Sequence, residues 1–442
     1  MIIRYTPERI LLLLADCSIL ILSLYVAISL RYGYFLTDKE FLNFLPPFLS
    51  IIFLSVLIFY IYGLYDKPTL RLIRELNKRI FTSQILTTLG VIILFYSMPI
   101  LGISPKTILL LYITISSILM SLWRRYAFSI LLRYKKQKSV IIGSGKEFKL
   151  LVDELSRNPH IGITIISIID VDNYDMSKLD DVLKTVKPNS IIIDMRDKRI
   201  KSYFGYLYTE MFEGSAILDI VDVYEDVFDM TPTDLINQEW IFRNIESLKK
   251  YSGLKRLIDL IISVPIYIFV LIFIFPFVYL AIKIEDGGPI IYTHKRVGLY
   301  GKIFSVYKIR SMENLPTNEL KETKKITKVG AFIRKTRIDE LPQLLNVIKG
   351  DISLIGPRPE TPSLVNEYSK TIPFYNVRHV VRPGLSGWAQ IHQHSVPKFG
   401  IDIEQTSIKL AYDMYYLEHR NLLLDLSIIL KTAKVLLSKS GV

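Results

Sequence analysis

Four long apolar runs near the N-terminus constrain this chain more than any other feature. They occupy residues 10–30, 44–62, 80–99 and 107–122. Each is close to the ~20 residues that a helix needs to cross a bilayer. The first run is too long for a cleaved signal peptide, and no small-residue cleavage site follows it. We therefore predict a four-helix transmembrane bundle over residues 1–135, and the alternative is a soluble core of four buried helices.

The loops between these runs differ in charge, and that difference predicts an orientation. Basic residues precede the first run, fill the second loop and follow the fourth run, whereas the first and third loops have few. Because cytoplasmic loops carry the excess of Lys and Arg, we expect both ends of the bundle on the cytoplasmic side of the membrane. The basic residues are Arg4, Arg9, Lys67, Arg71, Arg74, Lys78, Arg79, Arg124, Arg125, Arg133, Lys135, Lys136 and Lys138.

Residues 138–245 alternate between strand-like and helix-like segments, which predicts a Rossmann-like parallel α/β domain. Gly143 and Gly145 follow the first strand, where a dinucleotide loop would lie, and Asp170 and Asp172 end the second. Phe148 replaces the third glycine of that loop. We favour a structural or oligomerising role; nucleotide or nucleotide-sugar binding and a homodimer contact are left open.

A fifth apolar run covers residues 257–282 and differs from the first four. Pro265 and Pro276 lie inside it, and an interior proline bends a helix. Both flanks are basic, so we predict a re-entrant membrane helix over 250–284 that returns to the same face, with straight crossing as the alternative. The rest, 285–442, is then a small, mostly helical cytoplasmic domain. Its closing segment, 415–437, is amphipathic and suits either the membrane surface or internal packing.

The composition agrees with a chain divided between membrane and water. Half of the residues are hydrophobic, yet the net charge is +13. That excess suits anionic lipid or phosphorylated substrates, and we do not expect a nucleic-acid partner. The single cysteine, Cys17, excludes an intrachain disulfide and a cysteine-clustered zinc site.

Chemistry concentrates between residues 328 and 360. Leucine and isoleucine at helical spacing after residue 340 predict an amphipathic helix ended by Gly350. Asp339 would be its N-cap and Pro342 would lie in its first turn. Asp339 and Glu340 are then adjacent acids at the positive end of a helix, beside basic residues that include Arg337, which suits a phosphate. One acid could attack phosphorus while the other holds Mg²⁺; the alternative is that both only cap the helix.

Arg358 lies between Pro357 and Pro359. The two prolines stiffen the backbone, so the guanidinium is held in one direction. A turn that was only structural would need the prolines but not the arginine. This pattern therefore favours an anion-binding role for the residue.

Five motifs resemble the bacterial sugar transferase family, the polyprenyl-phosphate sugar-1-phosphate transferases. The resemblance covers about residues 250–440, and the four-run start with a Rossmann-like middle looks like the long form of that family. The motifs are Lys308-Ile309-Arg310-Ser311-Met312, the run from Asp339 to Val347 with Lys349-Gly350-Asp351, Gly356-Pro357-Arg358-Pro359, the run from Arg382 to Gln390, and Tyr412-Asp413-Met414-Tyr415-Tyr416.

The resemblance implies an enzyme that transfers a sugar-1-phosphate from a UDP-sugar to undecaprenyl phosphate and releases UMP. Asp339 would be the nucleophile that carries a phosphosugar, and Glu340 would bind Mg²⁺. Such enzymes begin exopolysaccharide, capsule or O-antigen assembly at the membrane lipid surface. The residues expected to bind substrate phosphate are Arg358, Pro359, Arg310, Arg337 and Lys308.

Two other functions were weighed. A membrane-anchored nucleotide-sugar dehydratase would need a complete glycine loop and a catalytic Tyr–Lys pair downstream, and the chain has neither in the expected place. A non-catalytic scaffold for glycan assembly is the second alternative. No motif identifies the sugar, whose recognition we expect in residues 313–327 and 392–404.

Overall fold

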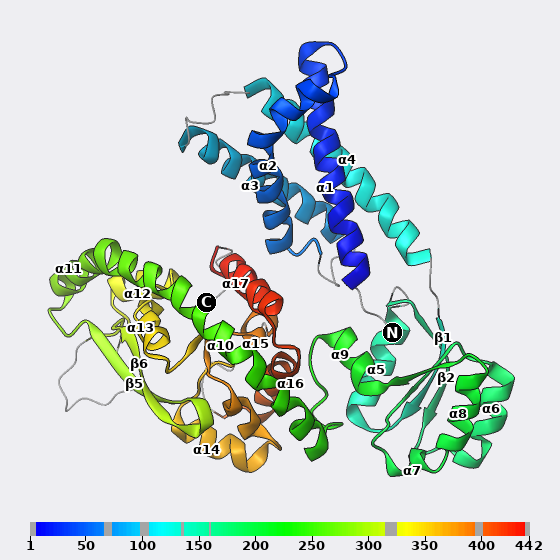
Figure 1. Ribbon diagram of the computed structural model, residues 1–442. Helices are drawn as coiled ribbons and strands as arrows, with labels where there is room; N and C mark the ends of the chain where they lie inside the picture. The colour runs from blue at the N-terminus through cyan, green and yellow to red at the C-terminus, as the bar shows by residue number, and fades with distance from the viewer. Residues whose placement is uncertain are drawn as a thin grey trace. The chain divides into compact units, whose positions relative to one another are not determined.

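The computed structural model describes residues 6–65, 73–97, 106–133, 137–158, 161–313, 325–393 and 401–437. The chain forms two compact units, Met1–Asp226 and Val227–Val442 (Figure 1). Several residues on which the predictions depend lie outside the described ones. They are the loop cations Arg4, Lys67, Arg71, Lys135 and Lys136, and residues 314–324 and 394–400 of the expected sugar-recognition segments.

Helices occupy all four N-terminal apolar runs. Segments of α1 and α4 (Leu11–Tyr32 and Thr107–Arg124) are long and apolar enough to span a bilayer. Within the described residues, α2 qualifies only as two segments bent by 61°, and the apolar part of α3, Arg79–Ile92, is shorter. The helices are therefore where we predicted them, while four spans remain a prediction. Their bounds are α1 Thr6–Tyr32, α2 Asp38–Ile61, α3 Ile73–Ser97 and α4 Lys106–Arg133.

One of the expected loop cations is instead part of the bundle core. Arg124 is 2% exposed and forms an ion pair with Asp16 of α1. The Tyr65 hydroxyl donates to the same Asp16 carboxylate at 2.8 Å, and Arg124 also donates to the Leu64 carbonyl oxygen at 3.1 Å. Buried charges are tolerated only when they are paired, so this contact fixes α1 against α4.

The second part of this unit is a four-stranded parallel sheet in the order β2-β1-β3-β4, which confirms the predicted α/β domain. Val140 and Ile142 of β1 pack against α6 and α8 on one face, and α5 lies on the other face (Figure 1). Val140, Ile141 and Ile142 are consecutive and all fully buried, so both faces of β1 are covered, as expected for a parallel sheet between helices. The bounds are β1 Gln137–Gly143, α5 Gly145–Arg157, β2 Ile163–Asp170, α6 Leu179–Val186, β3 Ser190–Ile193, α7 Lys198–Lys201, α8 Phe204–Phe212, β4 Ala216–Asp219 and α9 Ile220–Phe228.

The second unit begins with a long helix that carries the fifth apolar run. Helix α10, Gln238–Phe269, passes without a break through the boundary that we expected near residues 245–250. A π turn, Val270–Ile274, joins it to α11, Phe275–Glu285. Pro276 has no N–H to donate to the preceding turn, so a widened turn just before it is the expected response. Pro265 lies inside regular α10.

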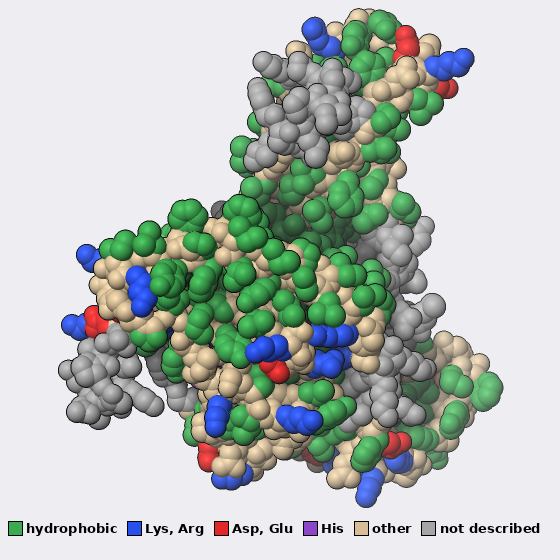
Figure 2. Space-filling view, turned by 60° about the vertical axis from the view of Figure 1, so that its left-hand side comes forward, with side chains coloured by type: hydrophobic (Ala, Val, Ile, Leu, Met, Phe, Trp, Pro, Cys, Tyr) green, Lys and Arg blue, Asp and Glu red, His purple; other side chains and the backbone are tan. Residues whose placement is uncertain are grey.

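This long helix presents an apolar face outward and a polar face to the domain. Leu257, Ile261 and Phe277 are 55%, 62% and 75% exposed, and Figure 2 shows a broad band of hydrophobic side chains there. Asp259, the acid inside the apolar run, is buried and accepts the backbone N–H of Leu354 at 3.1 Å. The residues Ser252–Glu285 are long and apolar enough to span a bilayer.

Both ends of this helix contact the same C-terminal domain, residues 285–442. At the α10 end, Arg256 donates to the carbonyl oxygens of Val347 and Ile348 at 2.6 and 2.7 Å. At the α11 end, Val278 and Ile282 pack in one cluster with residues of β6 and α12. The domain therefore lies along the helix and not beyond one of its ends.

This C-terminal domain contains short strands as well as the helices that we predicted. β5 and β6 form an antiparallel hairpin, and β7 and β8 form a parallel pair. The closing segment forms two helices, because one helix ends at His419 and the next begins at Leu422. The bounds are β5 Ile291–Val297, β6 Ile303–Ile309, α12 Lys328–Lys335, α13 Gln343–Lys349, β7 Ser353–Ile355, α14 Pro362–Thr371, β8 Gly384–Ser386, α15 Trp388–His392, α16 Ile403–His419 and α17 Leu422–Leu437.

Candidate functional site

The two adjacent acids lie on a single 3-10 turn, Ile338–Glu340, between α12 and α13. We expected Asp339 to be the N-cap of the helix, and that expectation is wrong: α13 begins at Gln343, with Pro342 at its N-cap. Arg337 starts the turn in the left-handed region, with φ of 57°. The backbone N–H groups of Glu340 and Leu341 then donate three residues back at 3.2 Å, and this closes a tighter turn than an α-helix.

Cations converge on Glu340. The Nζ of Lys308 lies 2.9 Å from Glu340 Oε1, and the Nη2 of Arg358 lies 3.1 Å from the same oxygen. The Nη1 of Arg337 follows at 3.9 Å. Burial opposes ionisation of Glu340, but Arg358 and Lys308 outweigh it and lower the pKa of the carboxyl to about 2. Glu340 is therefore a fixed negative charge at neutral pH.

Asp339 has the opposite electrostatic setting. Its side chain is buried, and its Oδ1 has no hydrogen-bond partner among the described residues. Burial raises the pKa of the Asp339 carboxyl, and the charge of Glu340 raises it further. Buried carboxylate oxygens are normally satisfied, so an unpartnered one next to a cationic cluster is a candidate reacting group.

The remaining predicted site residues are placed differently. Arg310 forms an ion pair with Asp286 and donates to two backbone carbonyls, so the structure does not bring its guanidinium to the acids. The carbonyl oxygen of Pro359 accepts Nη1 of Arg296 at 3.2 Å. Lys308, Arg337 and Arg358 are thus the predicted cations that the structure brings to Glu340.

A second charged cluster, which the sequence analysis missed, lies behind Arg358. Glu360 forms an ion pair with Lys409, and the nearest guanidinium nitrogens of Arg296 and Arg378 are 3.8 and 3.9 Å from it. Burial opposes ionisation of Glu360, but Lys409 and Arg378 outweigh it and lower its pKa to about 2. Arg378 Nη2 donates to the carbonyl oxygen of Arg358 at 3.0 Å. The cluster therefore fixes the backbone that carries Arg358.

His294 was also missed, and it lies on β5 two residues before Arg296. Tyr292, His294 and Arg296 alternate along the strand, and Lys308 pairs with Tyr292 across the hairpin, so their side chains share one face. Burial lowers the pKa of His294 to about 4, and neighbouring cations add to that effect. It is therefore neutral at pH 7. The alternation of polar residues on one strand face is the signal that could have found this group.

Helix α13 is held firmly beneath the acids. Asn346 is fully buried and donates to the carbonyl oxygen of Ser305 at 2.8 Å, while it accepts the N–H of Tyr307 at 3.1 Å. Tyr307 directly precedes Lys308 on β6. The amide of one helix residue thus fixes the strand that delivers the lysine to Glu340.

An apolar cavity of about 300 Å³ opens next to the turn. It lies between the π turn of the long helix and the start of α13. Its lining residues include Ile274, Phe275, Ile309, Leu341 and Pro342. Because Leu341 directly follows Glu340, the cavity places an apolar compartment beside the charged site.

The glycine pair of the α/β domain lies in the other unit. A Cβ on Gly143 would lie 2.8 Å from the ring of Phe148, so that ring packs directly against the loop. Arg199 donates to Ser144 Oγ at 3.0 Å and pairs with Asp172 at 2.7 Å. Polar groups that could face a ribose are therefore already bridged by an arginine; the structural role stays our prediction, with nucleotide binding as the alternative.

Known protein families match both parts of this chain. The family described as "Bacterial sugar transferase" matches residues 250–439, and "CoA-binding domain" matches residues 60–228. An N-acetylgalactosaminephosphotransferase of Aeromonas hydrophila, named for UDP-N-acetylgalactosamine and undecaprenyl phosphate, is 35% identical over 59% of this chain and 61% of its own length. The chain thus spans less than two thirds of that relative.

Two further relatives are matched over more of their length. An undecaprenyl-phosphate galactose phosphotransferase of Salmonella typhimurium is 30% identical over 69% of each chain. A UDP-glucose:undecaprenyl-phosphate glucose-1-phosphate transferase of Klebsiella pneumoniae is 30% identical over 70% of each chain. Fold, site and relatives together define an enzyme with a long apolar helix along its C-terminal domain. The chain belongs to the bacterial sugar transferase family in its long form, which confirms the resemblance and the expectation of an enzyme.

Proposed function

We propose that this protein transfers a sugar-1-phosphate from a UDP-sugar to undecaprenyl phosphate, releases UMP, and so begins assembly of a surface glycan. The observation that carries the proposal is the buried, unpartnered Asp339 oxygen beside a Glu340 that three cations hold ionised. The relatives' names, which combine a sugar phosphate with undecaprenyl phosphate, support the same reaction class.

The proposed reaction has two displacements at phosphorus. In the first, an Asp339 carboxylate oxygen attacks the β-phosphorus of the UDP-sugar; the new O–P bond forms as the bond to UMP breaks. In the second, a phosphate oxygen of undecaprenyl phosphate attacks the same phosphorus and releases Asp339. Phosphoryl transfer depends mostly on positioning and charge neutralisation, and Arg358 and Lys308 are placed to supply both.

The donor atoms fit Mg²⁺, the expected cofactor. Mg²⁺ binds through one or two carboxylates together with substrate phosphates, and Glu340 and Asp339 offer adjacent carboxylates, one with an unpartnered oxygen. Glu340 would hold the ion, which when bound supplies charge neutralisation at the diphosphate. Lys308 and Arg358 share Glu340 Oε1, so they keep the carboxylate ionised for that purpose.

We also propose that the site works at the membrane surface, on the cytoplasmic side. Support comes from the long helix: both of its ends contact the catalytic domain, as expected if it dips into one leaflet and returns. The apolar cavity beside Leu341 and Pro342 could accept the first part of a polyprenyl chain while its phosphate faces Asp339.

Trapping the covalent intermediate tests the proposal. Purified protein is incubated with a panel of UDP-sugars and Mg²⁺ without the lipid acceptor, and the peptide that contains residue 339 is examined by mass spectrometry. We expect a phosphosugar adduct on wild-type protein and none on Asp339→Asn. Glu367→Gln, an exposed acid on α14 of the same domain, is the matched control and should keep the adduct.

UMP release in membranes supplemented with undecaprenyl phosphate separates the competing functions. Release of UMP with a competent donor supports the transferase. Loss of the UDP-sugar through oxidation or dehydration would indicate the dehydratase, and no turnover with any donor would indicate a scaffold. Full activity of Asp339→Asn would refute the nucleophile assignment.

A further inference from the structure

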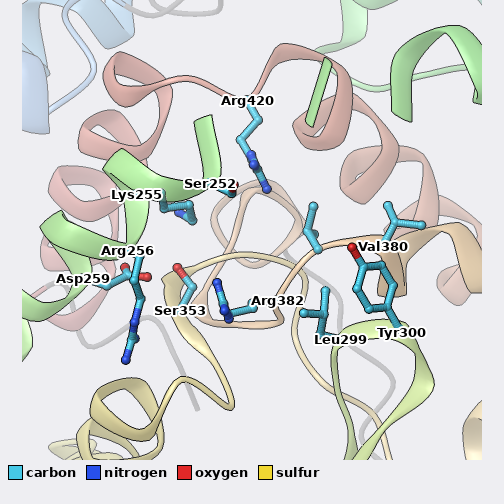
Figure 3. Close-up of a pocket in the computed structure, with 11 residues that line it drawn as sticks. Ser252, Lys255, Arg256, Asp259, Leu299, Tyr300, Ser353, Val380, Arg382 and Arg420 are labelled. Carbon is cyan, nitrogen blue, oxygen red and sulfur yellow. The ribbon is translucent and has the colours of Figure 1, made fainter. Parts of the chain in front are cut away.

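A second cavity, of about 270 Å³, lies in the same unit as Asp339 but away from it. Figure 3 shows Arg420 reaching into the space from above, with Arg382 and Ser353 on the opposite side. Five parts of the chain supply its walls: the start of the apolar part of α10, the tip of the β5–β6 hairpin, the start of β7, the segment before β8, and the residues before α17. Its lining residues are Ser252, Lys255, Arg256, Asp259, Leu299, Tyr300, Ser353, Val380, Val381, Arg382 and Arg420.

The cavity is separated from the transfer site by the length of α13. Arg256 donates to a carbonyl oxygen in the last turn of α13, and Arg382 donates to the carbonyl oxygen of Gly350, which follows that helix. Asp339 precedes the first turn of α13. The seven residues of α13 alone correspond to about 10 Å at ~1.5 Å per residue. A ligand in this cavity would therefore not reach the Asp339 carboxylate, so the cavity is a distinct site.

The charges that line the cavity are mainly positive. Lys255 pairs with Asp425, and Arg256 donates to two carbonyls of α13. The lining acid, Asp259, accepts the backbone N–H of Leu354. Arg382 donates its Nε to the carbonyl oxygen of Gly350, so its two terminal nitrogens can face the cavity. With Arg420 opposite, two guanidinium groups border one small space, an arrangement that suits a phosphate.

The position of the cavity along the chain sets its depth relative to a membrane. Ser252, on its wall, is the first residue of the segment long and apolar enough to span a bilayer. Leu254 and Leu257 of α10 are 51% and 55% exposed, and Leu423 of α17, three residues after Arg420, is 77% exposed. Cations that border exposed apolar side chains on two separate helices are typical of the headgroup level.

We propose that this cavity binds the phosphate group of an anionic membrane phospholipid, whose acyl chains then lie against the exposed leucines of α10 and α17. The site is separate from the transfer chemistry and does not depend on the role of Asp339. It would hold the C-terminal end of α13, and thereby the turn at its other end, at a fixed depth below the headgroups.

Lipid retention tests the proposal without reference to turnover. Full-length protein is placed in nanodiscs of phosphatidylglycerol and phosphatidylcholine in equal amounts, and bound lipid is measured by native mass spectrometry. We expect wild-type protein to retain phosphatidylglycerol preferentially. The double variant Arg382→Gln/Arg420→Gln should lose that preference by about tenfold or more, because each charge-assisted contact contributes substantially.

Two further variants keep the test decisive. Tyr300→Glu places a negative charge at the rim on a side chain that is 71% exposed, so it should fold and still reduce phosphatidylglycerol retention. Lys370→Gln removes a cation from the exposed face of α14 and should change nothing. Unchanged retention in both pocket variants would overturn the proposal. So would complete displacement by inorganic phosphate, which would indicate a soluble anion site, or selective displacement by undecaprenyl phosphate, which would assign the cavity to the acceptor.

Discussion

The charged cluster behind Arg358 leads to a quantitative prediction for Arg378→Gln. Arg378 and Asp413 are both 2% exposed, and Arg378 Nη2 lies 2.7 Å from Asp413 Oδ2. Removing one partner of a buried pair leaves the other charge uncompensated, which costs about 3–5 kcal/mol. For a domain of about 200 residues, each kcal/mol lowers Tm by ~2–4 °C, so we expect a decrease of about 10 °C.

Thermal unfolding in detergent, followed by circular dichroism, measures this change. The double variant Arg378→Gln/Asp413→Asn removes both charges and should recover at least half of the lost stability. Lys370→Gln breaks an exposed pair, 60% and 48% exposed, and should change Tm by no more than about 1 °C. A loss below about 1 kcal/mol in Arg378→Gln, or no recovery in the double variant, would refute the reasoning.

Three further predictions follow from the site and its scaffold. Burial and the charge of Glu340 raise the pKa of Asp339, and only the ionised acid attacks, so kcat/KM for UMP release should fall with decreasing pH around a pKa above the ordinary 3.8. Glu340→Gln should move this fall in kcat/KM to lower pH and weaken the Mg²⁺ dependence. An unchanged pH profile in that variant would contradict the effect of Glu340 on the pKa of Asp339. The pKa of Glu360 is lowered to about 2, so its contribution to the free energy of unfolding is complete above the unfolded-state pKa near 4.5 and is lost as pH falls toward 2. Lys409 is one of the groups that lower this pKa, so acid unfolding of Lys409→Met, followed by tryptophan fluorescence, should begin at higher pH than that of the wild type. In Gly384→Ala the new Cβ would lie 2.1 Å from the Gly356 nitrogen, so the turn that carries Arg358 should shift, with a lower Tm and at least tenfold less UMP release; normal activity would show that the two strands can separate without cost.

Sequence patterns predicted the features that depend on neighbouring residues. Apolar runs located the N-terminal helices and the strands of the α/β domain, and the adjacency of Asp339 and Glu340 identified the acids that the structure places in one turn. The same local reasoning failed at Asp339 itself, because a 3-10 turn started by Arg337 competes with N-capping of α13.

Contacts between distant residues could not be predicted in this way. Arg310 was expected at the phosphates, but Asp286, 24 residues earlier in the chain, takes its guanidinium. Glu360 meets Lys409 across 49 residues, and no periodic pattern connects those two positions. Such pairs depend on how the hairpin, α14 and α16 pack, which is a property of the complete domain.

The polar face of α10 has a practical consequence for anyone who wishes to excise the enzymatic portion as a water-soluble fragment. Cutting the chain after the long apolar helix would remove Lys255 from Asp425, and Asp259 from the Leu354 amide. The end carbonyls of α13 would also lose Arg256. Helix α10 is a packed part of the domain, so a soluble preparation should rely on amphiphiles or on redesign of the exposed apolar face and not on truncation.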